Sequence, residues 1–130
     1  MERSSFIAPN SERAFQEAKM LGLEVVLPEA NELQIDIDCP EDLEVLNHHF
    51  CILQKYERAE IIRDEPSKSG GDRRHIAIRL GRDISNLERI LLQSCLGSDR
   101  KREILSWVQH ANGDPHPTLF LEKSQPLLTA

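Results

Sequence analysis

Residues 33–38 alternate strictly between apolar and polar side chains, which is the pattern of a β-strand with one face in the protein core. Asp36 and Asp38 then emerge from the same polar face, roughly 7 Å apart because each strand residue rises about 3.3 Å. Two carboxylates at that spacing repel each other, and a divalent cation relieves the repulsion. An isolated Asp-x-Asp pair is more often a solvated strand end, so its interpretation depends on the rest of the chain.

The same alternation predicts further strands separated by turn residues. They cover residues 23–27, 60–65, 74–80 and 118–122. A polar loop that contains Gly70 and Gly71 joins the strands at 60–65 and 74–80, which indicates a hairpin with an open tip. A short turn after Pro28 leads from the strand at 23–27 into the strand at 33–38, so these two are also expected to form a hairpin.

Apolar residues at spacings of three and four predict helices. Helices are expected at 12–21, from Pro40 to about residue 56, after a capping box formed by Ser85 and Glu88, and after Ser98. In the last two helices we expect the apolar stripes to face the core and the basic first turn of the final helix to face outward. The stripes are Leu87, Ile90, Leu91 and Cys95, then Ile104, Leu105 and Val108, and the basic residues are Arg100, Lys101 and Arg102.

This order of elements predicts an α+β domain of ferredoxin-like, RRM-like topology, the split β-α-β-β-α-β arrangement. We expect an extension at 1–32, a core at 33–123 and a flexible tail at 124–130. The helices would cover one face of an antiparallel sheet, and the other face would be open unless the N-terminal segment covers it. Alternation assigns to that second face the side chains of Asp36, Asp38, His75, Arg79 and Glu122.

Composition narrows the class of protein. The chain has 130 residues, 39% hydrophobic and 29% charged, which is enough for a core without disulfides or structural metals. Its three cysteines are scattered and odd in number, which favours reduced thiols and a cytoplasmic location. Neither a signal peptide nor a membrane span is expected. The net charge of −6 argues against non-specific wrapping of nucleic acid, although residues 61–110, with 10 basic and 7 acidic side chains, could face a phosphate chain locally.

Three motifs in this order resemble the catalytic core of the archaeo-eukaryotic primase (primase-polymerase) superfamily. They are the strand with Asp36 and Asp38, the loop with Ser69 and Gly70 that leads to His75, and the hydrophobic strand that ends in Glu122. The resemblance covers about residues 33–123. The spacing from Ser69 to His75 is longer than in the compact Ser-x-His form, and the chain carries no zinc-binding insertion.

The resemblance implies a metal-dependent nucleotidyltransferase that makes or extends primers in DNA replication or repair. Asp36, Asp38 and Glu122 would hold Mg²⁺ or Mn²⁺, with Asp99 as the other candidate for the third acid. Partners would be nucleoside triphosphates, a nucleic acid template and a helicase or other replication protein. Contacts to the nucleotide would come from Lys68, Ser69, Gly70, Arg74, His75 and Arg79.

Other functions remain open at this point. The main alternative is a catalytically inactive RRM-like module that binds nucleic acid or protein, although only 5% of the residues are aromatic and base stacking is poorly provided for. The second alternative is a metal-dependent nuclease or a replication initiator that nicks DNA. The initiators need a His-hydrophobic-His strand and a nucleophilic tyrosine, but the sequence has no such pair of histidines, and Tyr56 is its only tyrosine. A structural protein with solvated acids is the third alternative.

Overall fold

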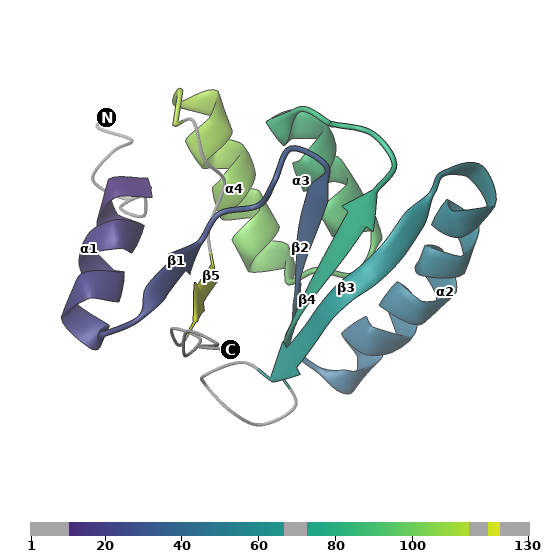
Figure 1. Ribbon diagram of the computed structural model, residues 1–130, viewed down its shortest axis with the longest axis horizontal. Helices are drawn as coiled ribbons and strands as arrows, with labels where there is room; N and C mark the ends of the chain where they lie inside the picture. The colour runs from purple at the N-terminus through teal and green to yellow at the C-terminus, as the bar shows by residue number, and fades with distance from the viewer. Residues whose placement is uncertain (1–10, 67–72, 115–119, 123–130) are drawn as a thin grey trace, which may run out of the picture.

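The computed structural model describes residues 11–66, 73–114 and 120–122, and for 11–13 and 120–122 it describes the backbone alone. Four helices and five strands make up these parts of the chain (Figure 1). In chain order they are α1 (Ser11–Leu21), β1 (Glu24–Val26), β2 (Glu32–Ile37), α2 (Pro40–Tyr56), β3 (Ala59–Pro66), β4 (Arg74–Leu80), α3 (Asn86–Cys95), α4 (Arg100–Ala111) and β5 (Phe120–Glu122). None of the described helices is long and apolar enough to cross a membrane.

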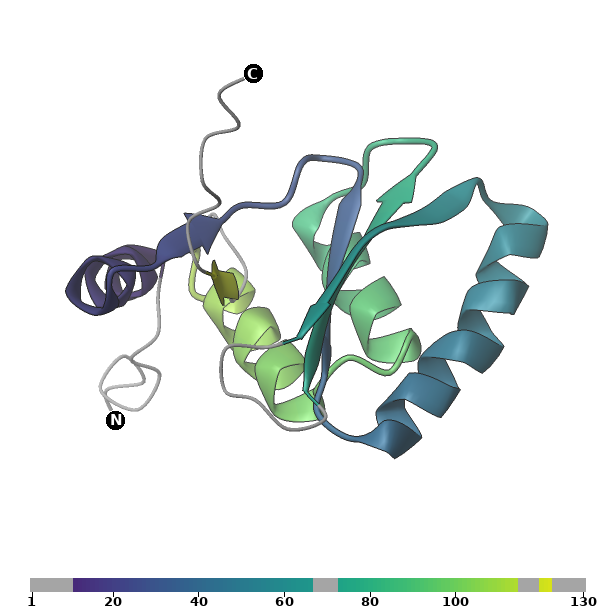
Figure 2. The same cartoon turned by 60° about the horizontal axis from the view of Figure 1, so that its bottom comes forward.

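The centre of the fold is a three-stranded antiparallel sheet in the order β2-β4-β3. The predicted hairpin of the strands at 60–65 and 74–80 is confirmed, because β3 pairs with β4 throughout, with one irregularity between Ile61 and Arg63. The apolar face of β2 is fully buried, as its alternation predicts. Helices α2 and α3 pack on this face, and Figure 2 shows both on the same side of the sheet. The core residues are Leu33, Ile35, Ile37, Leu46, Ala59, Ile76, Ile78, Leu80, Ile84 and Leu96.

The α+β class and the antiparallel sheet are confirmed, but the four-stranded closure of the predicted topology is not. Strand β5 pairs with β1 in a separate two-stranded sheet, with Glu24 opposite Glu122. The predicted hairpin between the strands at 23–27 and 33–38 is therefore wrong, because β1 pairs with β5 and β2 pairs with β4. The N-terminal segment also covers part of the second sheet face: the Gln34 side chain donates a hydrogen bond to the Val26 carbonyl at 2.9 Å.

The buried side of helices α3 and α4 differs from the one predicted. Most of the expected core stripe is exposed, and the buried faces of the two helices are mainly polar. The exposed apolar residues are Leu87, Leu91, Ile104 and Trp107, whereas the buried polar residues are Arg89, Gln93, Arg102, Glu103, Ser106 and Gln109. Arg102, expected to face outward, is only 6% exposed. The reason lies at the edge of the sheet.

Candidate functional site

Strand β2 forms one edge of the main sheet, so half of its backbone groups point away from β4. The Asn31 carbonyl just before β2 accepts a hydrogen bond from the Leu80 amide at 2.7 Å. By the two-residue period of a strand, the amides and carbonyls of Glu32, Gln34 and Asp36 then face outward. Each of these groups, if buried without a partner, would cost about 1–3 kcal/mol.

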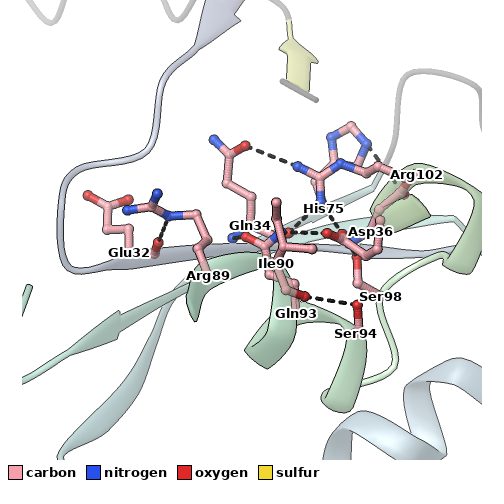
Figure 3. A network of polar contacts seen from close by, with 11 residues as sticks. Glu32, Gln34, Asp36, His75, Arg89, Ile90, Gln93, Ser94, Ser98 and Arg102 are labelled. Carbon is pink, nitrogen blue, oxygen red and sulfur yellow. Dashed lines mark hydrogen bonds and ion pairs between the residues drawn. The ribbon is translucent and has the colours of Figure 1, made fainter. Parts of the chain in front are cut away.

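Side chains and backbone from the α3–α4 region satisfy this edge (Figure 3). The Gln34 amide donates to Gln93 Oε1 at 2.8 Å, and the Asp36 amide donates to Ser98 Oγ at 3.0 Å. The Asp99 amide donates to the Asp36 carbonyl at 2.7 Å. The Gln34 carbonyl accepts from Arg102 Nη1 at 2.6 Å, and the Glu32 carbonyl accepts from Arg89 Nε at 2.8 Å. A fourth strand therefore has no free backbone groups to pair with at this edge, which explains why β5 lies elsewhere.

A buried carboxylate holds these side chains in place. Glu103 is 3% exposed and accepts hydrogen bonds from Gln93 Nε2 at 2.9 Å, Ser98 Oγ at 2.7 Å and Arg102 Nη1 at 2.8 Å. We call Gln93, Ser98, Arg102 and Glu103 the edge network. A buried ion pair needs further hydrogen bonds to offset its lost hydration, and β2 supplies two of them: Arg102 Nη1 donates to the Gln34 carbonyl at 2.6 Å and Nη2 to Gln34 Oε1 at 3.3 Å.

Asp36 and His75 lie opposite each other on β2 and β4, next to the edge network. The distance from His75 Nε2 to Asp36 Oδ1 is 3.8 Å, and the two side chains are 11% and 24% exposed, respectively. Burial raises the pKa of the Asp36 carboxyl above its ordinary value of 3.8. The positive charges of Arg102 and His75 act against this shift in pKa, whereas the negative charges of Asp99 and Asp38 add to it. The charges of Arg102, Asp99 and Asp38, and that of His75 when it is protonated, therefore all act on the Asp36 carboxyl.

Asp38 follows the last residue of β2 and is more exposed than Asp36. Its Oδ1 atom forms an ion pair with Arg73 Nε at 2.9 Å, with the two side chains 44% and 53% exposed. An exposed pair of this kind contributes little to stability. Asp38 and Arg73 are therefore available to a ligand at the solvent side of Asp36.

The structure brings some of the predicted site residues together and leaves others apart. Arg79 faces Glu60 at 3.6 Å and lies four residues along β4 from His75, about 13 Å by strand rise. Arg74 contacts Asp64 at 2.7 Å and, as the neighbour of His75 in a strand, points to the opposite face. Lys68, Ser69 and Gly70 lie outside the described residues.

Of the two candidates for the third acid, Asp99 is the one with a contact to Asp36 among the described residues. Its backbone amide binds the Asp36 carbonyl, and its charge acts on the Asp36 carboxyl. The Glu122 backbone pairs with Glu24 in the two-stranded sheet, and its side chain is outside the described part of the structure. The position of the described backbone therefore favours Asp99.

Within the described residues, no group of three or more His, Cys, Asp or Glu side chains is placed to hold a metal ion by itself. Magnesium sites in phosphoryl-transfer proteins commonly use one or two carboxylates, with substrate phosphates and water completing the shell. Carboxylate oxygens from Asp36, Asp38 and Asp99 are of the right chemical kind for such a shared site. Burial is the main cause of the raised pKa of Asp36, and the negative charges of Asp99 and Asp38 add smaller contributions to it.

Sequence reasoning missed the edge network. Arg102, Ser106 and Gln109 follow each other at spacings of four and three, so they form a polar stripe along α4 at the helical period. Such a stripe is usually a solvent-exposed face, and the sequence contains nothing that distinguishes it from one. The outward-facing backbone groups of β2, one of which accepts a hydrogen bond from Arg102, become evident only from the position of β2 in the sheet.

Comparison with known proteins gives no relative for this chain. No protein-family model matches it, and neither the curated proteins nor the solved structures contain a match.

Proposed function

We propose that this protein is a metal-dependent nucleotidyltransferase module of primase-polymerase type. The observation that supports the proposal best is the meeting of charges at Asp36: His75 lies 3.8 Å away, and Asp99, Asp38 and Arg102 all act on the same carboxyl. Two adjacent strands and the start of α4 contribute these residues, so the arrangement depends on the fold and not on one local motif.

Each residue has a role that suits its chemistry. Asp36 and Asp99, with Asp38 at the solvent side, would hold Mg²⁺ or Mn²⁺ together with the substrate phosphates. A metal bound there would supply charge neutralisation and activation of the attacking hydroxyl. In the reaction a 3′-hydroxyl oxygen forms a bond to the α-phosphorus of a nucleoside triphosphate, and the bond to the leaving pyrophosphate breaks. His75 and Arg73 would donate hydrogen bonds to phosphate oxygens, and Arg102 favours the ionised form of Asp36.

The sheet surface argues against the main alternative in its nucleic-acid-binding form. RRM-type modules stack bases on aromatic side chains of the sheet. Strands β2, β3 and β4 contain no Phe, Tyr or Trp among their residues, and Phe120 belongs to β5 in the other sheet. A surface that displays Asp36 and Asp38 would also repel a phosphate chain unless a cation were present.

The test is calorimetric titration of a nucleoside triphosphate into the full chain, first with Mn²⁺ and then with excess chelator. We expect binding that needs the metal and is lost in Asp36→Asn, an isosteric change that removes one charge. The matched control is Asp83→Asn, which removes an exposed carboxylate outside the site and should bind as the unmodified chain does. Primer extension on a DNA template would then test catalysis.

Two results would contradict the proposal. Binding that is equally tight in chelator, or equally tight in Asp36→Asn, would remove the carboxylates from the site. No binding under any condition would favour a catalytically inactive relative that acts as an interaction module. His75→Ala gives an independent check, since weaker binding in the presence of Mn²⁺ is expected if the imidazole contacts phosphate.

A further inference from the structure

The outer surface of the helix pair carries an apolar groove that the proposed reaction does not use. Side chains of α3 and α4 line an open groove of about 790 Å³ between the two helices. Its large apolar side chains are between half and two-thirds exposed: Leu87 49%, Leu91 62%, Ile104 63% and Trp107 54%. Such concentrated exposure of large apolar residues is uncommon on a monomer and marks an interaction site.

The packing of α3 and α4 explains why this surface is apolar. Their polar sides face the edge of β2, where the edge network satisfies the backbone, so their apolar sides point to solvent. The helix pair thus packs against the sheet edge on one side and exposes the apolar groove on the other. A partner on that side would remove the apolar groove residues from water, which is favourable.

The spacing of the groove residues indicates what kind of partner fits. Leu87, Leu91 and Ser94 follow each other at four and three residues on α3, and Arg100, Ile104 and Trp107 do the same on α4. This is the spacing of core positions in packed helical bundles. Two parallel ridges with a groove between them accept another pair of helices, as in a four-helix bundle.

The charges at the groove ends match those of a second copy of the same chain. A short connection joins α3 to α4, so Arg100 lies at the turn end of the groove and Glu88 at the far end. A two-fold axis across the middle of the groove exchanges the ends, so Glu88 of each copy, which also lies 3.8 Å from Arg82 of its own chain, would lie at the same end of the bundle as Arg100 of the other copy. This self-complementarity is the property that an isologous interface requires. We propose that the chain forms a homodimer in which the α3–α4 grooves of two copies pack into a four-helix bundle.

The position of Trp107 makes the proposal directly measurable. It is the only tryptophan in the chain and is 54% exposed in the single copy. Dimerisation would bury it, so its emission should shift to shorter wavelength and acrylamide quenching should fall as the protein concentration rises. Sedimentation equilibrium of the full chain gives the mass over the same range. A reducing agent is required throughout because Cys51 and Cys95 are exposed.

Variants separate the groove from other exposed apolar residues. Leu91→Glu should weaken the dimer at least tenfold, whereas Ile52→Glu, on the exposed side of α2 at 52% exposure, should leave it unchanged. Glu88→Gln should weaken it a few-fold without harming the helix start, because Gln also serves in a capping box. Circular dichroism confirms that each variant is folded.

Two outcomes overturn the proposal. The first is a monomer at concentrations of several hundred micromolar with Trp107 still quenched freely, which would leave the groove to a different protein. The second is a dimer that Leu91→Glu leaves intact or that Ile52→Glu disrupts, which would locate the interface elsewhere. Neither outcome bears on nucleotide binding, so this proposal and the proposed enzymatic function can fail separately.

Discussion

Replacing Glu103 by glutamine tests whether the edge network holds the helix pair on the sheet. The change keeps the volume and removes one charge from a side chain that is 3% exposed. The carboxylate accepts from three donors, and Arg102 Nη1 lies 2.8 Å from Oε2. A glutamine amide can present only one oxygen to this set, so its nitrogen must face at least one existing donor.

Rearranging the neighbouring amide does not remove the conflict. If the new amide nitrogen faced Gln93, the Gln93 side chain would have to turn its own oxygen toward it. That oxygen already accepts from the Gln34 amide at 2.8 Å, so turning it would leave the β2 backbone unsatisfied. If the nitrogen faced Ser98 and Arg102 instead, a donor would meet two existing donors, and in either orientation the buried guanidinium loses its counter-charge.

The expected cost follows from the burial. Removing one partner of a buried, hydrogen-bonded ion pair destabilises a protein by about 3–5 kcal/mol. For a domain of this size, that corresponds to a fall in melting temperature on the order of 10 to 25 °C. Because total stabilities are about 5–15 kcal/mol, a large part of the folding free energy is at stake.

Urea denaturation followed by far-ultraviolet circular dichroism measures this change. The matched control is Glu60→Gln, which alters an exposed pair with Arg79 at 3.6 Å and should not move the midpoint measurably. In a double-mutant cycle, Arg102→Met with Glu103→Gln should cost less than the sum of the single changes by about 1–3 kcal/mol. A loss below about 1 kcal/mol for Glu103→Gln, or strict additivity in the cycle, would refute the reasoning.

Three further predictions concern other parts of the chain. Asp36→Asn should be more stable than the unmodified chain at neutral pH, because the pKa of Asp36 is raised in the folded protein. Folded Asp36 binds its proton more tightly than unfolded Asp36 does. The unmodified chain therefore loses stability as the pH rises from 3.8 through the raised pKa. Melting temperatures across that range should therefore converge at the acidic end, and a constant difference would contradict this. Gly97→Ala should unfold at a much lower urea concentration than Gly113→Ala. Both glycines have a positive φ, +86° and +85°, so backbone strain is similar in the two variants. A Cβ at position 97 would lie 2.8 Å from the Asp42 carbonyl oxygen, whereas a Cβ at position 113 has no atom within 4 Å. Equal midpoints would show that backbone strain alone decides. Ser85→Ala should cost about 1 kcal/mol by loss of the capping box, and an unchanged urea midpoint would mean that the box adds nothing.

The local elements of this protein follow from its sequence. The alternation at 33–37 produces a strand with a fully buried apolar face, Pro40 starts α2, and Ser85 with Glu88 forms the predicted capping box. The β3–β4 hairpin also forms as predicted. These features depend on interactions between residues close in the chain, or on the alternation of apolar and polar residues within a single strand. The pairing of Asp36 with His75 follows from the same hairpin order once β2 lies beside β4.

Tertiary structure alone decided which side of α3 and α4 is buried, and therefore where β5 could pair. A polar stripe such as Arg102, Ser106 and Gln109 has the same composition whether it faces water or a sheet edge. What distinguishes the two cases is the set of outward-facing backbone groups on β2, more than 50 residues earlier in the chain, which no local pattern records. Those groups have to be hydrogen-bonded when buried, and the polar side chains of the helix pair meet that need. The sequence thus determined the elements, and the hydrogen-bonding demand of one sheet edge decided how they assemble.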